Sequence, residues 1–159
     1  MNKPIAAFLI GARLRDALFA PAVLEEIKSL VDARFAQSVE RAPSVEDAAE
    51  LMQGAEVAVC SWGSPAIDAR LLAAAPNLKK VIYAAGSVKP IVTPELIERG
   101  IPVTSGAAVI AENVAETTLG YIIVGLKNAW RIAQETRRGG WWSTPEQARA
   151  RELYGLTVG

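Results

Sequence analysis

The stretch that decides the fold of this chain is Val57-Ala58-Val59-Cys60-Ser61-Trp62. The run is largely apolar and does not alternate with polar residues, as is typical of a strand covered on both faces. Ser64-Pro65 follows closely and has the pattern of a helix start, in which a capping hydroxyl precedes a proline. A buried strand that leads directly into a helix indicates an α/β protein.

The alternation of strand and helix continues on both sides of this stretch. Pro21 divides an apolar helical pattern over 14–31, and Ser44 and Thr93-Pro94 each have the pattern of a helix start. We therefore expect a parallel five-stranded sheet with helices on both faces. The predicted strands are 5–10, 34–39, 57–62, 80–84 and 101–104.

Charge and composition argue against several classes of function. The formal net charge is zero and there is no long basic run, so neither nucleic acid nor an anionic membrane is expected as the main partner. The apolar run after Pro4 is too short for a signal sequence or a membrane span. The chain has no histidine, the commonest general acid and base near neutral pH, which argues against a self-contained catalytic site.

Cys60 is the only cysteine and lies within an apolar run. The favoured interpretation is a buried, unreactive side chain rather than a nucleophile. One cysteine cannot form a disulfide within the chain, so a reducing cytoplasm is the expected location.

Three predicted loops lie at the carboxyl ends of strands, which is where sheets of this kind bind ligands. They are 11–13, 62–64 and 85–88. In the second loop, Trp62 and Gly63 are candidate substrate-binding residues. The tryptophan is expected either to wall a pocket or to pack in the core.

The loop Ala85-Gly86-Ser87-Val88 is the strongest candidate site. Gly86 permits a positive φ, and consecutive backbone N–H groups of Gly86, Ser87 and Val88 would form an anion-binding concavity. A tight turn from strand to helix without any ligand is the alternative.

Six segments occur in a characteristic order along the chain. Leu78-Lys79-Lys80-Val81 follows a helix, Asn113-Val114-Ala115-Glu116 begins one, and Arg138-Gly139-Gly140-Trp141 forms a linker. The others are 85–88, 93–103 and 153–159. Together they resemble the substrate-side domain of the D-isomer-specific 2-hydroxyacid dehydrogenases, over about the last two-thirds of the chain.

The resemblance implies a flavodoxin-like domain that holds a small 2-hydroxy or 2-keto acid, and a Rossmann domain that binds NAD or NADP. It implies that the substrate carboxylate meets the N–H groups of the loop aligned with Gly86 and Ser87. It also implies that Asn113 approaches the nicotinamide side of the cofactor. Hydride would pass between the nicotinamide and C2 of the substrate.

The family's catalytic arginine, glutamate and histidine all follow the segment that 153–159 resembles, so no residue here is assigned a catalytic role. Leu156-Thr157-Val158 indicates the start of a strand that continues. We therefore expect a substrate-binding domain over 1–104, a hinge, long helix and linker over 105–150, and the first residues of a Rossmann domain over 151–159. The chain alone is expected to be inactive.

Several positions depart from the family's pattern. Ser87 replaces the second glycine of the loop, and Lys89 replaces an acidic residue. Thr117 stands where a histidine is frequent, and Ser105-Gly106-Ala107 replaces an Asn-x-Pro turn. The substrate is therefore left open. The choice between NAD and NADP is also left open, because it would be set by an acidic or basic residue in the Rossmann domain.

A long helix is predicted to begin at Asn113, with Glu116 completing a capping box, and to run to about Arg138. It is apolar around nearly its whole circumference, so it must be buried on all sides. We expect it to pack between domains or subunits, with a homodimer formed through 114–133. A central helix of one compact domain is the alternative.

Other classes of protein fit less well. A receiver-like signalling domain would need an aspartate where the third strand ends in Cys60-Ser61, and a flavin-binding electron carrier would need hydroxyls in the loop that begins Gly11-Ala12-Arg13. A non-catalytic module that binds carboxylates or mediates assembly stays open as an alternative. Its main support is the absence of histidine.

Overall fold

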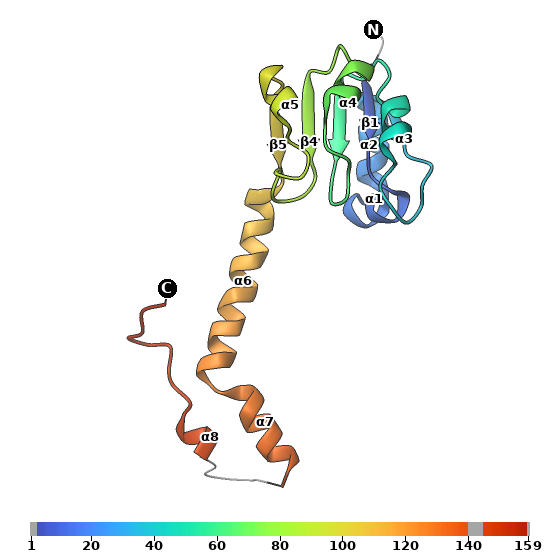
Figure 1. Cartoon of the computed structure of the whole chain (residues 1–159). Coiled ribbons are helices and arrows are strands. Elements are labelled where there is room, and N and C mark those ends of the chain that lie inside the picture. The colour runs from blue at the N-terminus through green and yellow to red at the C-terminus, as the bar shows by residue number, and fades with distance from the viewer. Residues whose placement is uncertain (1–2, 140–144, 159) are drawn as a thin grey trace. The chain divides into compact units, whose positions relative to one another are not determined.

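The computed structural model describes residues 3–139 and 145–158 (Figure 1). The chain divides into two compact units, residues 1–110 and 111–159. The first unit contains the sheet, and each unit is described by itself.

The first unit is built on five parallel strands in the order β2-β1-β3-β4-β5. In the register, Ala7 lies opposite Ala58, and Val59 lies opposite Ile82. The predicted parallel α/β sheet is therefore confirmed. The strands are β1 (Ile5–Phe8), β2 (Asp32–Phe35), β3 (Val57–Cys60), β4 (Lys80–Tyr83) and β5 (Val103–Ser105).

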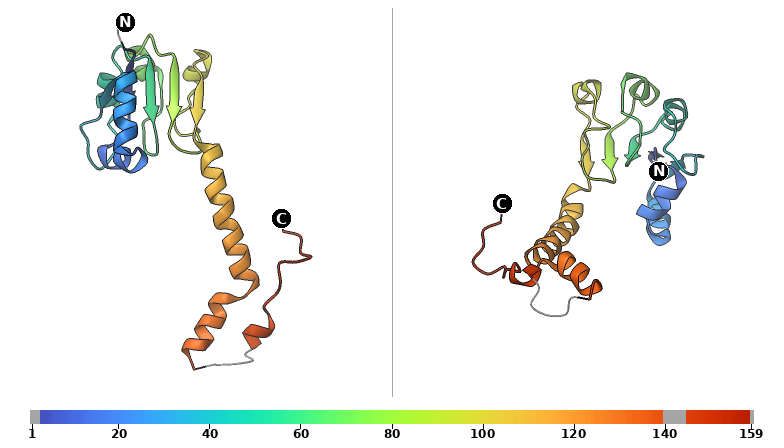
Figure 2. Two further views of the ribbon diagram at one scale, coloured as in Figure 1. Left: turned by 180° about the vertical axis from the view of Figure 1, so that it is seen from behind. Right: turned by 60° about the horizontal axis from the view of Figure 1, so that its bottom comes forward.

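Helices cover both faces of the sheet, as expected. From β1 the chain moves to β2 at one edge of the sheet, whereas the connections β2 to β3, β3 to β4 and β4 to β5 all move toward the other edge. Because each crossover is right-handed, the helices between β1 and β2 lie on the opposite face from the other helices. Figure 2 shows α1 and α2 in blue on one side of the strands, and α4 and α5 on the other. The helices are α1 (Ala12–Leu18), α2 (Pro21–Leu30), α3 (Val45–Leu51), α4 (Ala69–Ala74) and α5 (Pro94–Glu98).

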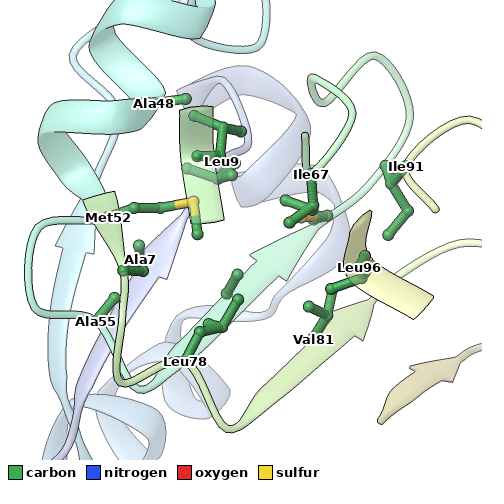
Figure 3. Packing of buried hydrophobic residues seen from close by; sticks show 14 of the residues in the cluster. Ala7, Leu9, Ala48, Met52, Ala55, Ile67, Leu78, Val81, Ile91 and Leu96 are labelled. Carbon is green, nitrogen blue, oxygen red and sulfur yellow. The ribbon is translucent and has the colours of Figure 1, made fainter. Parts of the chain in front are cut away.

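The larger core cluster lies between the sheet and α3, α4 and α5 (Figure 3). Leu9, Met52 and Ile67 are among its fully buried members. A smaller cluster on the other face packs Phe8 against Phe19 and Phe35, with ring centroids 6.1 and 4.9 Å apart. The side chains of β3 are divided between the two clusters, which explains its apolar run.

Two of the predicted helix starts are confirmed by their caps. Ser44 Oγ accepts a hydrogen bond from Asp47 N, and Thr93 Oγ1 accepts one from Leu96 N. The start predicted at Ser64-Pro65 is wrong, because α4 begins at Ala69. Asp68 caps α4, while the hydroxyl of Ser64 is bonded to the carbonyl of Leu9.

Helix α6 (Ala107–Leu126) crosses the division between the units and leads to α7 (Ala129–Arg137) and α8 (Pro145–Ala148). The single helix predicted from Asn113 to Arg138 is therefore wrong at its start and its middle. Asn113 lies inside α6 and cannot cap it, since the alanine-rich turn before it is already helical. The helix breaks at Asn128, whose φ is 51°.

Two predictions concern the end of the chain. Residues 140 and 141 of the linker predicted over 138–141 lie outside the described residues, whereas Arg138 and Gly139 directly follow α7. Residues 156–158 are described and do not form the predicted strand. A strand needs a neighbour to satisfy its backbone, and no described segment pairs with these residues.

Candidate functional site

The candidate site lies at the carboxyl edge of the sheet, where the strand order reverses between β1 and β3. Because all five strands are parallel, the loops that follow β1, β3 and β4 leave from this same edge (Figure 2). They are the three loops predicted from the sequence to bind a ligand, 11–13, 62–64 and 85–88.

The loop after β4 presents a series of unused backbone donors. The carbonyl of Ala85 accepts a hydrogen bond from Gly106 N at 2.9 Å, and that of Val88 accepts one from Ile91 N at 3.0 Å. Among the described residues, no acceptor is found for the N–H groups of Gly86, Ser87 and Val88. Such donors suit an anion, since backbone N–H groups carry partial positive charge.

The loop does not use the positive φ that Gly86 permits. Gly86 does not have a positive φ, although five other described glycines do. A β-carbon at Gly86 would make only an ordinary contact with Ile110 Cδ1 at 4.0 Å. The loop therefore does not depend on the conformational freedom of glycine at this position.

Trp62 and Gly63 line a pocket of about 410 Å³ at the same edge. Trp62 is 53% exposed, so the alternative that it packs in the core is wrong. The pocket also includes Gly11 and Arg41, whose backbones approach so closely that a β-carbon on Gly11 would collide with the carbonyl of Arg41. The remaining lining residues are Leu14, Glu40 and Ala42.

The structure does not bring all the predicted site residues into one pocket. Trp62 and Gly63 share theirs with the loop after β1, whereas Gly86, Ser87 and Val88 are not among its lining residues. Asn113 lies in α6 within the second unit. The substrate and cofactor roles of these residues stay predictions.

Two buried serines at this edge, Ser61 and Ser64, were not among the predicted site residues. Ser61 N and Oγ, and Ser64 Oγ, all make hydrogen bonds that join the ends of β1, β3 and β4. The sequence feature that could have indicated them is the pair of hydroxyl side chains that flanks Trp62-Gly63, directly after the buried strand.

At this edge of the sheet, the described residues with shifted pKa values are Cys60 and Tyr83, and neither suits a role as nucleophile or base. Burial raises the pKa of the Cys60 thiol to about 12, so it stays protonated and does not suit a nucleophile. Burial, and to a smaller degree the neighbouring Cys60, raise the pKa of Tyr83. No cluster of three potential metal ligands occurs among the described residues.

The sequence of this chain matches a family of known proteins. The sequence model for the D-isomer specific 2-hydroxyacid dehydrogenase catalytic domain matches residues 16–153, which is most of the chain. The chain belongs to the D-isomer-specific 2-hydroxyacid dehydrogenases. The family and the fold that the sequence segments predict are thereby confirmed.

Two individual proteins similar to this chain show the extent of the match. The chain is 30% identical over 139 residues to a glyoxylate reductase of Thermofilum pendens, covering 86% of this chain and 40% of that protein. The PH0520 protein of Pyrococcus horikoshii has a TM-score of 0.68 and 27% identity, over 89% of this chain and 39% of that one.

A D-lactate dehydrogenase of Aquifex aeolicus, solved with NAD and lactic acid, shares the fold. Its TM-score is 0.64 at 23% identity, over 93% of this chain and 41% of that one. The chain thus spans about two-fifths of the length of these three proteins.

Proposed function

We propose that this chain is the substrate-binding portion of an NAD(P)-dependent oxidoreductase that acts on the CH–OH group of a D-2-hydroxy acid. In the reverse direction the enzyme would reduce a 2-keto acid. The observation that carries the proposal is the row of three unused N–H groups, Gly86 to Val88, at the carboxyl edge of a sheet of this family.

The chemistry assigned to this chain is binding and orientation. The N–H groups of Gly86, Ser87 and Val88 hold the substrate carboxylate. Trp62 and Gly63, which line a different pocket at the same edge of the sheet, are proposed as further substrate contacts. Fixing the carboxylate orients C2 of the substrate for reaction. NAD or NADP, when bound, supplies or accepts the hydride.

The described residues do not by themselves form a cofactor site. They contain no glycine-rich loop between a strand and a helix of the kind that holds a pyrophosphate. We therefore derive no step through the cofactor, and we propose that sequence outside this chain binds most of it. Asn113 is the one residue proposed to contact it.

The chain alone is expected to be inactive, and we propose a cytoplasmic location because its one cysteine is buried and unpaired. Steady oxidation of NADH or NADPH with glyoxylate by the purified chain, above the blank without protein, would contradict the expected inactivity.

The proposed carboxylate site is tested by titrating the isotope-labelled chain with glyoxylate and pyruvate while following amide shifts. We expect shifts at Gly86, Ser87 and Val88, at millimolar ligand. Ser87→Pro removes one donor and should weaken binding, whereas Ser87→Ala keeps every donor and serves as the matched control. Shifts confined to other loops would contradict the proposal.

We also propose a homodimer formed through residues 114–133, which include parts of α6 and α7. Leu119, Ile123 and Trp130 are 50, 41 and 61% exposed, and no residue of α6 is buried. By length and composition α6 is also apolar enough to cross a membrane. We favour a protein partner because Glu112 and Glu116 lie within the helix and the family match extends across it.

The alternative function is a non-catalytic module that binds carboxylates or mediates assembly. It is favoured by one observation, the absence of histidine from the sequence. Glyoxylate binding by the chain, together with no reductase activity in any longer natural form of the protein, would support it.

A further inference from the structure

The backbone ladder between β1 and β3 is interrupted by a serine hydroxyl. Leu9 N donates to Val59 O at 2.8 Å, and in a regular parallel ladder Ser61 N would next donate to Leu9 O. Instead Ser61 N donates to Ser64 Oγ at 2.9 Å, and Ser64 Oγ donates to Leu9 O at 2.6 Å. The hydroxyl thus stands between the two strands at the point where the strand order reverses.

The ladder between β3 and β4 ends in a similar way. Ala84 N donates to Cys60 O at 2.8 Å, so that Trp62 N would next donate to Ala84 O. That carbonyl accepts instead from Ser61 Oγ at 3.0 Å. Within the described part of the chain, Trp62 N has no acceptor.

Both serines are buried, with exposed fractions of 0% for Ser61 and 7% for Ser64. A buried hydroxyl adds little net stability, because it exchanges a bond to water for a bond to protein. Its effect on geometry is larger here. The N–H of Trp62 is left without a partner in the sheet, and the hydroxyl of Ser61 is hydrogen-bonded to the carbonyl of Ala84, which directly precedes the loop 85–88.

We propose that Ser61 and Ser64 are positioning residues for the substrate carboxylate. Neither serine touches the substrate. Each hydroxyl takes the place of a backbone hydrogen bond in the ladder. Together they leave the N–H of Trp62 without a partner in the sheet and fix the start of the loop, so that the N–H groups of Trp62 and of 86–88 are available to the carboxylate at the carboxyl edge of the sheet. The proposal rests on the function proposed above, because it assumes that the loop 86–88 binds a carboxylate.

The first test needs no ligand and no substitution. Hydrogen exchange of the unmodified chain should be fast at Trp62 N–H and slow at Ser61 N–H, although the two residues are adjacent. Slow exchange at Trp62 would overturn the proposal, since that amide would then be bonded within the sheet.

The second test measures glyoxylate affinity of Ser61→Ala and Ser64→Ala by amide shifts. We expect each to bind about fivefold more weakly, as for the loss of one net hydrogen bond. Ser64→Thr keeps the hydroxyl and should restore the affinity. Leu78→Ala is the matched control, because it destabilises the core before β4 and should leave the affinity unchanged.

The outcomes separate the two proposals. Equal glyoxylate affinity in the unmodified chain and both alanine variants overturns the positioning role and leaves the proposed function intact. Failure of glyoxylate to shift the amides of 86–88 in the unmodified chain overturns the proposed function, and the positioning role with it. Weaker binding by Leu78→Ala to the same degree also overturns the positioning role, since lost stability would then explain the effect.

Discussion

Cys60 ends β3, and its side chain is fully buried. Burial raises its pKa to about 12, against 9.0 for a free thiol. At pH 8 the native chain should therefore react with an aromatic disulfide reagent far more slowly than the chain unfolded in urea. Equal rates in the two states would show that the thiol is accessible.

The same shift has a consequence for stability at high pH. Above pH 9 the unfolded chain loses the Cys60 proton while the folded chain keeps it, so the unfolded state is favoured as the pH rises toward 12. The free energy of unfolding should fall over this range, and less steeply in Cys60→Ala. Denaturant titrations of both chains at pH 8 and pH 10 measure the difference.

Gly11 illustrates a steric requirement at a single residue. A β-carbon there would collide with the backbone of Arg41, so Gly11→Ala should lower the free energy of unfolding by about 1–3 kcal/mol. Gly86→Ala is the matched control, because its β-carbon meets only Ile110 Cδ1 at an ordinary distance. Its stability should stay within about 0.5 kcal/mol. Equal effects in a urea titration would contradict the predicted difference.

At the scale of elements, the break between α6 and α7 depends on Asn128. Its left-handed backbone is combined with side-chain hydrogen bonds from Nδ2 to Glu146 O at 2.9 Å and to Glu146 Oε2 at 2.7 Å. Asparagine tolerates this conformation better than most residues, and its amide joins α8 to the break.

Substitution of Asn128 separates the two contributions. Asn128→Ala loses both hydrogen bonds and strains the backbone, with an expected cost of about 2 kcal/mol in local stability. Asn128→Gly loses the bonds without strain and should cost less. Hydrogen exchange of the amides over 124–133 measures both. A larger loss for the glycine variant would show that backbone strain is not important here.

At the scale of the whole molecule, the proposed homodimer can be tested by changing residues of the interface and measuring the oligomeric state. Ile123 and Leu126 lie in α6, and we expect their replacement by glutamate to convert a dimer to monomers or to make the chain insoluble. Ile97→Glu is the control, since Ile97 is 68% exposed in α5, outside the proposed interface. Sedimentation that shows the unmodified chain as a monomer at high micromolar concentration would contradict the dimer.

The sequence by itself determined the class of fold, the family and the alternation of five strands with helices in the first unit. Local signals were sufficient where they act within a few residues: Ser44 and Thr93 cap their helices because the hydroxyl and the bonded N–H lie three residues apart. The apolar run of β3 predicted burial on both faces because each side of a strand must be covered separately. Candidate loops followed from topology, since parallel strands end at one edge.

Tertiary structure alone decided how individual side chains are used. Ser64 has the sequence pattern of a cap, yet its hydroxyl bonds to Leu9, 55 residues away, and α4 begins later. The side chain of Asn128, at the break between α6 and α7, is hydrogen-bonded to Glu146, which is 18 residues distant. Trp62 faces a pocket formed with the loop after β1. In each case the partner is remote in sequence, so a local pattern carries no information about the hydrogen bond or contact that decides the outcome.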